Sequence, residues 1–98
     1  MHGSDVKQVF VACDAGMGSS VLLTTQLAKR FKDLGVQVAH SQVDRVPPDA
    51  QVILCHEALV GRARGAAPGA VVVPFRMFIG DPAFDRLERA LRQDEVLA

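Results

Sequence analysis

The sequence predicts an α/β protein with a four-stranded parallel sheet of order 2-1-3-4 and helices on both faces, a Rossmann-like arrangement. The main observation is that strand-like apolar runs alternate with helical patterns along the 98 residues, as expected of βαβ units. Several of these runs are continuously apolar, which is typical of strands buried on both faces. Right-handed crossovers then place the first strand in the interior of the sheet.

The individual elements follow from periodicity and from capping residues. Helical spacing of leucines and Phe31 predicts a helix over residues 21–34, ended by Gly35. Asp81 and Pro82 fit the N-cap and first position of a last helix. A short helix is expected within residues 56–67, and residues 74–80 are expected to form an apolar loop. The predicted strands are residues 7–12, an edge strand at 36–43, 51–55 and 70–73.

The composition indicates one domain without nucleic-acid partners. Residues 7–95 are expected to form a single domain, with residues 1–6 as a disordered N-terminus or a remnant of cloning. Eleven Lys and Arg residues balance eleven Asp and Glu residues, which argues against a nucleic-acid surface. Apolar runs fall short of the about 20 residues that span a bilayer, so a cytoplasmic protein is expected. Cys13 and Cys55 are expected to be reduced thiols in that compartment.

The stretch with the clearest chemical meaning follows the first predicted strand. A strand, a glycine-rich turn and a helix N-terminus in succession form a nest of backbone N–H groups suited to an oxyanion or phosphate. The residue that opens this nest is Cys13, and the local positive field there favours a thiolate nucleophile. An inert buried cysteine is the alternative interpretation. The whole stretch reads Cys13-Asp14-Ala15-Gly16-Met17-Gly18-Ser19-Ser20.

Two covalent chemistries fit a loop headed by cysteine. A tyrosine-phosphatase loop places an arginine six positions after the cysteine, but Ser19 stands there, so the bidentate clamp on the phosphoryl group is missing. A phosphocarrier, which holds a phosphoryl group and passes it on, has no need of that clamp. An anion-binding module without covalent chemistry is a third possibility.

The octapeptide resembles the phosphocysteine loop of IIB proteins of the bacterial phosphoenolpyruvate-dependent sugar phosphotransferase system, above all the mannitol-type branch. The resemblance extends through Pro47-Pro48-Asp49, the turn containing His56 and the apolar loop before the last helix. It implies a cytoplasmic domain that receives phosphate from a IIA phosphohistidine and delivers it to a sugar held by a membrane-embedded IIC unit. The expected sugar is mannitol or another hexitol. A regulatory IIB-like module within a transcription regulator is the alternative.

Carried onto this sequence, the resemblance implies roles for individual residues. Cys13 is the phosphorylated nucleophile, and the backbone amides of residues 14–20 hold the phosphoryl oxygens with help from the hydroxyls of Ser19 and Ser20. No metal or other cofactor is implied, because amides and the helix dipole balance the charge. The isolated domain is expected to be a monomer that meets its IIA and IIC partners transiently.

Other residues receive weaker assignments. Asp14 is unexplained, because its carboxylate should oppose both a thiolate and a phosphate beside it. His56 is a possible auxiliary group, although a local capping role is the simpler interpretation. An apolar collar for partner docking is expected from Met17, Val21, Phe75 and Met77.

Overall fold

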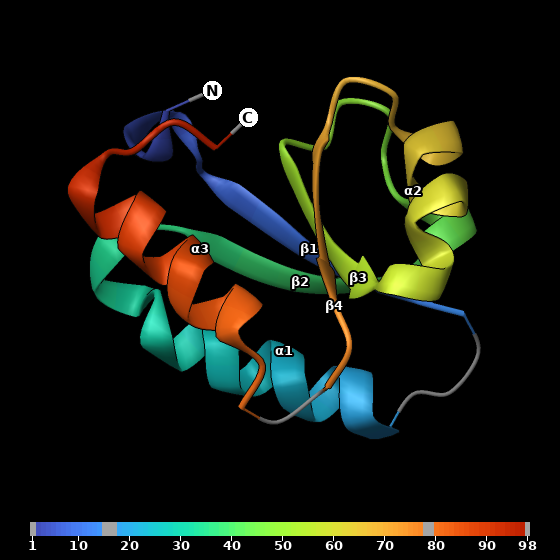
Figure 1. Ribbon diagram of the computed structural model, residues 1–98, viewed down its shortest axis with the longest axis horizontal. Helices are drawn as coiled ribbons and strands as arrows, with labels where there is room; N and C mark the ends of the chain where they lie inside the picture. Colours follow the sequence, from blue (N-terminus) through green and yellow to red (C-terminus); the bar gives the residue numbers. More distant parts are fainter. Residues whose placement is uncertain (1, 15–17, 78–79, 98) are drawn as a thin grey trace.

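The strands form one parallel sheet in the order β2-β1-β3-β4 (Figure 1). The computed structural model describes residues 2–14, 18–77 and 80–97. The predicted fold class and strand order are confirmed. The strands are β1 (Gln8–Cys13), β2 (Gln37–Gln42), β3 (Val52–His56) and β4 (Val71–Phe75). The α-helices are α1 (Gly18–Arg30), α2 (Val60–Ala66) and α3 (Pro82–Gln93).

Helices cover both faces of the sheet, α1 and α3 on one and α2 on the other (Figure 1). Side chains alternate along β1, so Val9 and Val11 pack in the core under α1 and α3, whereas Phe10 packs in the core under α2. The predicted apolar stripe is buried at Leu27 in α1 and at Phe31, the residue after the helix, and both side chains are almost fully inaccessible. Two layers of apolar side chains therefore hold the interior strands β1 and β3 from both sides.

The ends of several elements differ from their predicted positions. The first helix begins at Gly18 instead of residue 21 and ends at Arg30, followed by a short 3₁₀ turn at Lys32–Leu34. The last strand runs to Phe75, because Pro74 lies on the edge strand β4, where a missing N–H group costs no pairing with a further strand. The region 56–67 divides into a 3₁₀ turn, Glu57–Leu59, and the helix α2.

The described part of the segment before β1 contacts the end of α3. Gly3–Asp5 form a 3₁₀ turn, the Gly3 N–H donates to the Glu95 carbonyl at 2.9 Å, and the Ser4 N–H donates to Asp94 Oδ1 at 2.8 Å. A Cβ atom at Gly3 would lie 2.0 Å from the carbonyl oxygen of Ala90. The close contact with α3 therefore requires glycine at this position.

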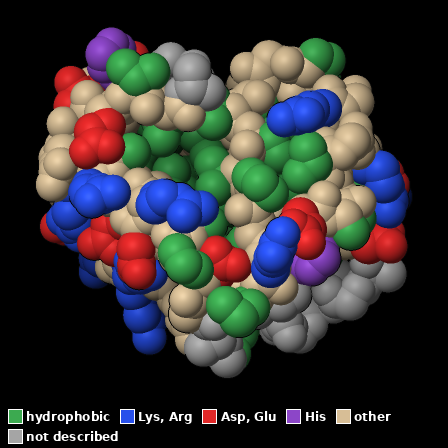
Figure 2. Space-filling view, in the orientation of Figure 1, with side chains coloured by type: hydrophobic (Ala, Val, Ile, Leu, Met, Phe, Trp, Pro, Cys, Tyr) green, Lys and Arg blue, Asp and Glu red, His purple; other side chains and the backbone are tan. Residues whose placement is uncertain are grey.

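An ionic network joins α1 to α3, where Figure 2 shows basic and acidic side chains next to one another. Arg30 contacts Glu88 and lies 2.8 Å from Asp85 Oδ1. Arg92 donates to Glu88 Oε2 at 2.8 Å and to Asp33 Oδ2 at 2.8 Å. These hydrogen bonds hold the pKa of Glu88 below its usual value, with Arg92 the largest cause and Arg30 the second. The network fixes the helix that follows the cysteine loop against the last helix.

Candidate functional site

Cys13 occupies the carboxyl end of an interior strand. It is the last residue of β1, which has β2 on one side and β3 on the other. The strands β2 and β3 lie on opposite sides of β1, so the order of the strands reverses at β1. Ligands of such sheets bind beyond the carboxyl ends of the strands at this switch point. The Cys13 side chain is buried, with an exposed fraction of 5%. The predicted nucleophile therefore lies where the fold places ligands.

The Cys13 thiol contacts a histidine on the neighbouring strand. Its Sγ atom lies 3.0 Å from Nε2 of His40, which belongs to β2. Sequence reasoning missed this contact, because residues 36–43 were expected to form an edge strand and none of them was assigned to the site. The register of β1 against β2 is the signal that locates it: Val11 pairs with His40, so Cys13 lies two residues further along on the same face.

Asp14, whose charge was unexplained, is ion-paired with an arginine from α2. The Arg62 guanidinium donates to Asp14 Oδ1 at 2.9 Å through Nη1 and to Asp44 Oδ2 at 2.5 Å through Nη2. A third bond joins Nε to Asp44 Oδ1 at 3.2 Å. The Arg62 bonds hold the pKa of Asp44 below its usual value, and the two carboxylates raise that of Arg62. The Asp14 carboxylate, next to Cys13 in the chain, is thus ion-paired with a residue 48 positions further along.

The predicted phosphate loop is described only in part. Ala15, Gly16 and Met17 lie outside the described residues. Gly18 and Ser19 open α1, and Ser20 is buried in its first turn with an exposed fraction of 2%. The N–H groups of a first helical turn lack carbonyl partners within the helix and carry the positive end of its dipole. The start of α1 can therefore supply hydrogen-bond donors for an anion.

His56 makes a local capping contact. Its Nδ1 atom accepts a hydrogen bond from the Ala58 N–H at 3.1 Å, at the start of the 3₁₀ turn after β3. Its ring meets Phe75 edge-on, with centroids 6.4 Å apart. Both contacts fit the simpler of the two interpretations made from the sequence, the capping role. The auxiliary role stays a prediction.

The expected docking collar is only partly exposed. Phe75 was wrongly assigned to it: the residue is 2% exposed and packs against Phe84 with ring centroids 5.2 Å apart. The reason is that β4 extends through Phe75 and turns this side chain into the core. Val21 and Met77 do project, with exposed fractions of 47% and 53%. Met17 lies outside the described residues.

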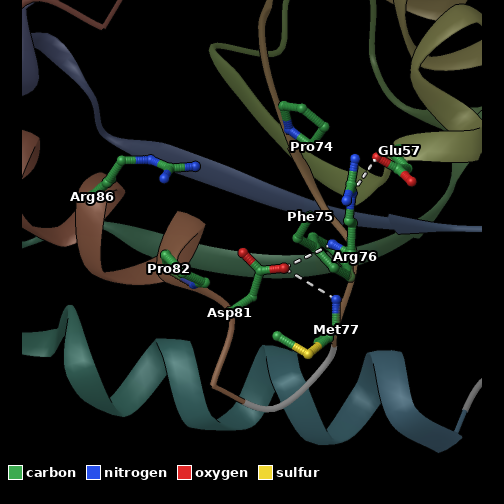
Figure 3. A pocket seen from close by; sticks show the side chains of 8 residues that line it. All are labelled: Glu57, Pro74, Phe75, Arg76, Met77, Asp81, Pro82 and Arg86. Atoms are coloured by element: carbon green, nitrogen blue, oxygen red, sulfur yellow. Dashed lines mark hydrogen bonds and ion pairs between the residues drawn. The ribbon is translucent and has the colours of Figure 1, made fainter.

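The segment after β4 is held by one buried carboxylate. Figure 3 shows the Asp81 carboxylate facing Arg76 and Met77, whose backbone N–H groups donate to Oδ2 at 2.8 and 3.1 Å. Its other oxygen, Oδ1, caps α3 by accepting from the Ala83 N–H at 2.8 Å. These residues line an open depression of about 510 Å³, along whose side the Arg76 side chain bonds to Glu57 at 2.9 Å. Asp81 therefore fixes the polypeptide at this point of the sheet edge.

The remaining chemical groups lie apart from this site. Cys55 lies deep in the core under α2, and burial raises the pKa of its thiol to about 11. Among the residues that the structure describes, clusters of three or more metal-ligating side chains do not occur. In the same part of the chain, each helix is too short or too polar to cross a membrane.

Fold and site together define a parallel α/β domain with a cysteine at the switch point, in contact with a histidine and followed by an ion-paired aspartate. The family model described as "PTS system, Lactose/Cellobiose specific IIB subunit" matches residues 8–89. The chain belongs to this family, the IIB subunits of the sugar phosphotransferase system (PTS).

Curated relatives carry the same domain within longer proteins. The mannitol-specific EIICB components of Staphylococcus carnosus and Staphylococcus saprophyticus are 32% and 35% identical over 95 and 92 residues, 94% and 91% of this chain. The mannitol-specific EIICBA component of Pasteurella multocida is 34% identical over 93 residues, 93% of this chain. The aligned parts are 18%, 18% and 15% of those proteins, so this chain spans less than a fifth of their length.

Proposed function

We propose that this chain is a phosphocarrier domain in which Cys13 accepts a phosphoryl group from a IIA phosphohistidine and passes it to a sugar held by a IIC unit. The observation that carries the proposal is the position of Cys13 as the last residue of an interior strand, directly before the segment that leads into α1. Membership of the IIB family supports the same role. A regulatory module is the weaker candidate, since the relatives are named as transport components.

The geometry fits transfer better than hydrolysis. Phosphoryl transfer needs mainly positioning and donors for the equatorial oxygens, which the start of α1 supplies. The guanidinium of Arg62 is of the kind that clamps a phosphoryl group in phosphatases, but here it is engaged by the carboxylates of Asp14 and Asp44. With its guanidinium so occupied, the site holds a phosphoryl group without the strong cationic clamp that assists water attack.

The partners and the sugar follow from the relatives. Their names combine IIC and IIB in one component, which supports a IIC partner and attachment of this domain to the cytoplasmic face of a membrane. The IIA donor is proposed because membership of the IIB family implies it, and a phosphohistidine supplies the activated phosphoryl group that a thiolate nucleophile needs. Mannitol is the proposed sugar, on the names of these relatives. Exposed Val21 and Met77 are the proposed docking residues among those described.

Intact mass measurement tests the proposal. The protein is incubated with phosphoenolpyruvate and the upstream carriers, ending in a mannitol-type IIA protein. The wild type and a Cys55→Ala control should each gain one phosphoryl group that is lost on adding mannitol and membranes bearing IIC. The Cys13→Ser variant should gain none. Equal labelling of that variant, or no labelling of the wild type, refutes the assignment.

A further inference from the structure

His40 is the described side chain in hydrogen-bond contact with the proposed nucleophile. Its Nε2 atom lies 3.0 Å from Cys13 Sγ, a short distance for a contact to sulfur. The two residues lie 27 positions apart on adjacent strands. Cys13 is buried and His40 is partly buried, so the contact is only partly open to solvent.

The sheet geometry fixes this contact. Val11 pairs with His40 and Cys13 pairs with Gln42 in the register of β1 and β2. Residues two apart on a strand share a face, so Cys13 and His40 are diagonal neighbours on the face covered by α1. The contact is therefore built from backbone pairing of two strands and does not depend on a loop.

Among the described residues, the carboxylates that follow β1 and β2 in the chain are engaged by an arginine. The nearest carboxylate in the chain, Asp14, is ion-paired with Arg62, as is Asp44 after β2. The basic residues of α1, Lys29 and Arg30, lie in its last turn at the opposite end of the sheet. The side chains that α1 and the adjoining strands bury on this face are uncharged: Ser20, Leu23, Leu27, Val9, Val11 and the partly buried Val38.

We propose that His40 is the proton acceptor that activates Cys13 for phosphoryl transfer, an inference that rests on the proposed function. As Sγ approaches the donor, the thiol proton moves to Nε2 of His40, the Sγ–P bond forms and the N–P bond of the IIA phosphohistidine breaks. The freed donor imidazole takes one proton from solvent, and His40 returns its proton to solvent. The net change moves the phosphoryl group one way and a proton the other.

The size of the effect has a physical ceiling. Free thiols in general are already a few per cent ionised at neutral pH, so a neighbouring base can raise the reactivity of a thiol by about 30-fold at most. We expect loss of the imidazole to slow the reactions of Cys13 by about 10-fold at pH 7. The effect is smaller than that of a typical general base, about 10²–10⁴-fold, because a thiol ionises more readily than a hydroxyl.

Alkylation by iodoacetamide tests the inference without any phosphotransfer partner. The rate of Cys13 labelling is followed by peptide mass spectrometry in the wild type, in His40→Gln and His40→Asn, and in a Ser41→Ala control on the same strand. Glutamine and asparagine retain hydrogen-bonding groups but cannot take up a proton. Deeply buried Cys55 is the internal reference for an intact fold, since unfolding exposes it to the reagent.

The expected result is about 10-fold slower labelling of both His40 variants at pH 7, with the control at the wild-type rate. At pH 10 the rates should converge within about twofold, because hydroxide then ionises the thiol unaided; a packing defect would leave the gap unchanged. Wild-type rates in either His40 variant at pH 7, or an equal deficit at both pH values, overturn the inference. If the wild type alkylates as expected but gains no phosphoryl group from IIA, the proposed function fails and the role of His40 in thiol activation stands.

Discussion

Replacing Asp81 by alanine should destabilise the protein by about 1.5–4 kcal/mol. Its carboxylate accepts three backbone hydrogen bonds, from Ala83, Arg76 and Met77. The cap of α3 is worth about 0.5–2 kcal/mol. The two bonds to the segment after β4 add about 1–2 kcal/mol together, because their N–H groups regain water when the carboxylate is removed.

The assay is urea unfolding followed by circular dichroism, with the melting temperature as a second measure. A loss of this size lowers the melting temperature by roughly 10–20 °C in a domain of this length. Asp81→Ser separates the two contributions, since its hydroxyl can cap α3 but is too short to reach Arg76 and Met77 as well. The serine variant should therefore lose about half as much stability as the alanine variant.

Acid provides an independent check on the same carboxylate. Hydrogen bonds from Ala83, then Arg76, hold the Asp81 pKa below its ordinary value. A lowered folded-state pKa means that this stabilisation is complete above the unfolded pKa of about 3.9, starts to decline there, and is lost as the pH falls through the lower folded-state pKa. The difference between the wild type and Asp81→Ala should narrow between pH 7 and pH 3. A loss below about 1 kcal/mol at pH 7, or serine as harmful as alanine, would refute the reasoning.

Three further predictions concern the site and the core. Arg62→Gln should slow phosphorylation by IIA about 3- to 10-fold in single-turnover assays, because the Asp14 carboxylate then acts on the thiolate unopposed; adding Asp14→Asn should restore the rate, and an unrestored rate would contradict the charge argument. Phe75→Ala should lower the free energy of unfolding in urea by about 3–5 kcal/mol, because the side chain is buried. Met77→Ala should change it by no more than about 0.5 kcal/mol and should weaken the binding of IIA measured by calorimetry. The reverse pattern would contradict the assignment of Phe75 to the core. Glu88→Gln should be less stable than the wild type at pH 7, and because the Glu88 pKa is lowered, the gap should close as the pH falls below about 4.3; a gap independent of pH would exclude ionic stabilisation.

Local pattern was sufficient to predict the fold. The continuous apolar character of β1 and β3 and the helical stripe with Phe31 specify which faces are buried, and burial dominates the choice of architecture. The Asp81-Pro82 pair identified the start of α3 correctly. Ends of elements were less predictable, because Pro74 is compatible with an edge strand or a loop, and tertiary packing of Phe75 selects the strand.

The cysteine was recognisable from its own segment, but its surroundings were not. His40 contacts Cys13 across a separation of 27 positions, and Arg62 contacts Asp14 across a separation of 48. The local sequence around neither residue indicates a role in the site. Their contacts depend on strand register and on the placement of α2, neither of which a single sequence specifies closely. The sequence therefore indicates a carboxylate at Asp14 that opposes a thiolate and a phosphate, whereas the fold pairs this carboxylate with Arg62.

The long sequence separation of these contacts bears on the order of folding. In chain order, α1 and then β2 follow Cys13, and β2 contributes His40. The strand β3 comes next, and only after it α2, which contributes Arg62. Contacts between distant segments form late, since the loops between them must close first. During folding, Cys13 therefore acquires its contact with His40, and Asp14 its ion pair with Arg62, only as these distant segments join the sheet.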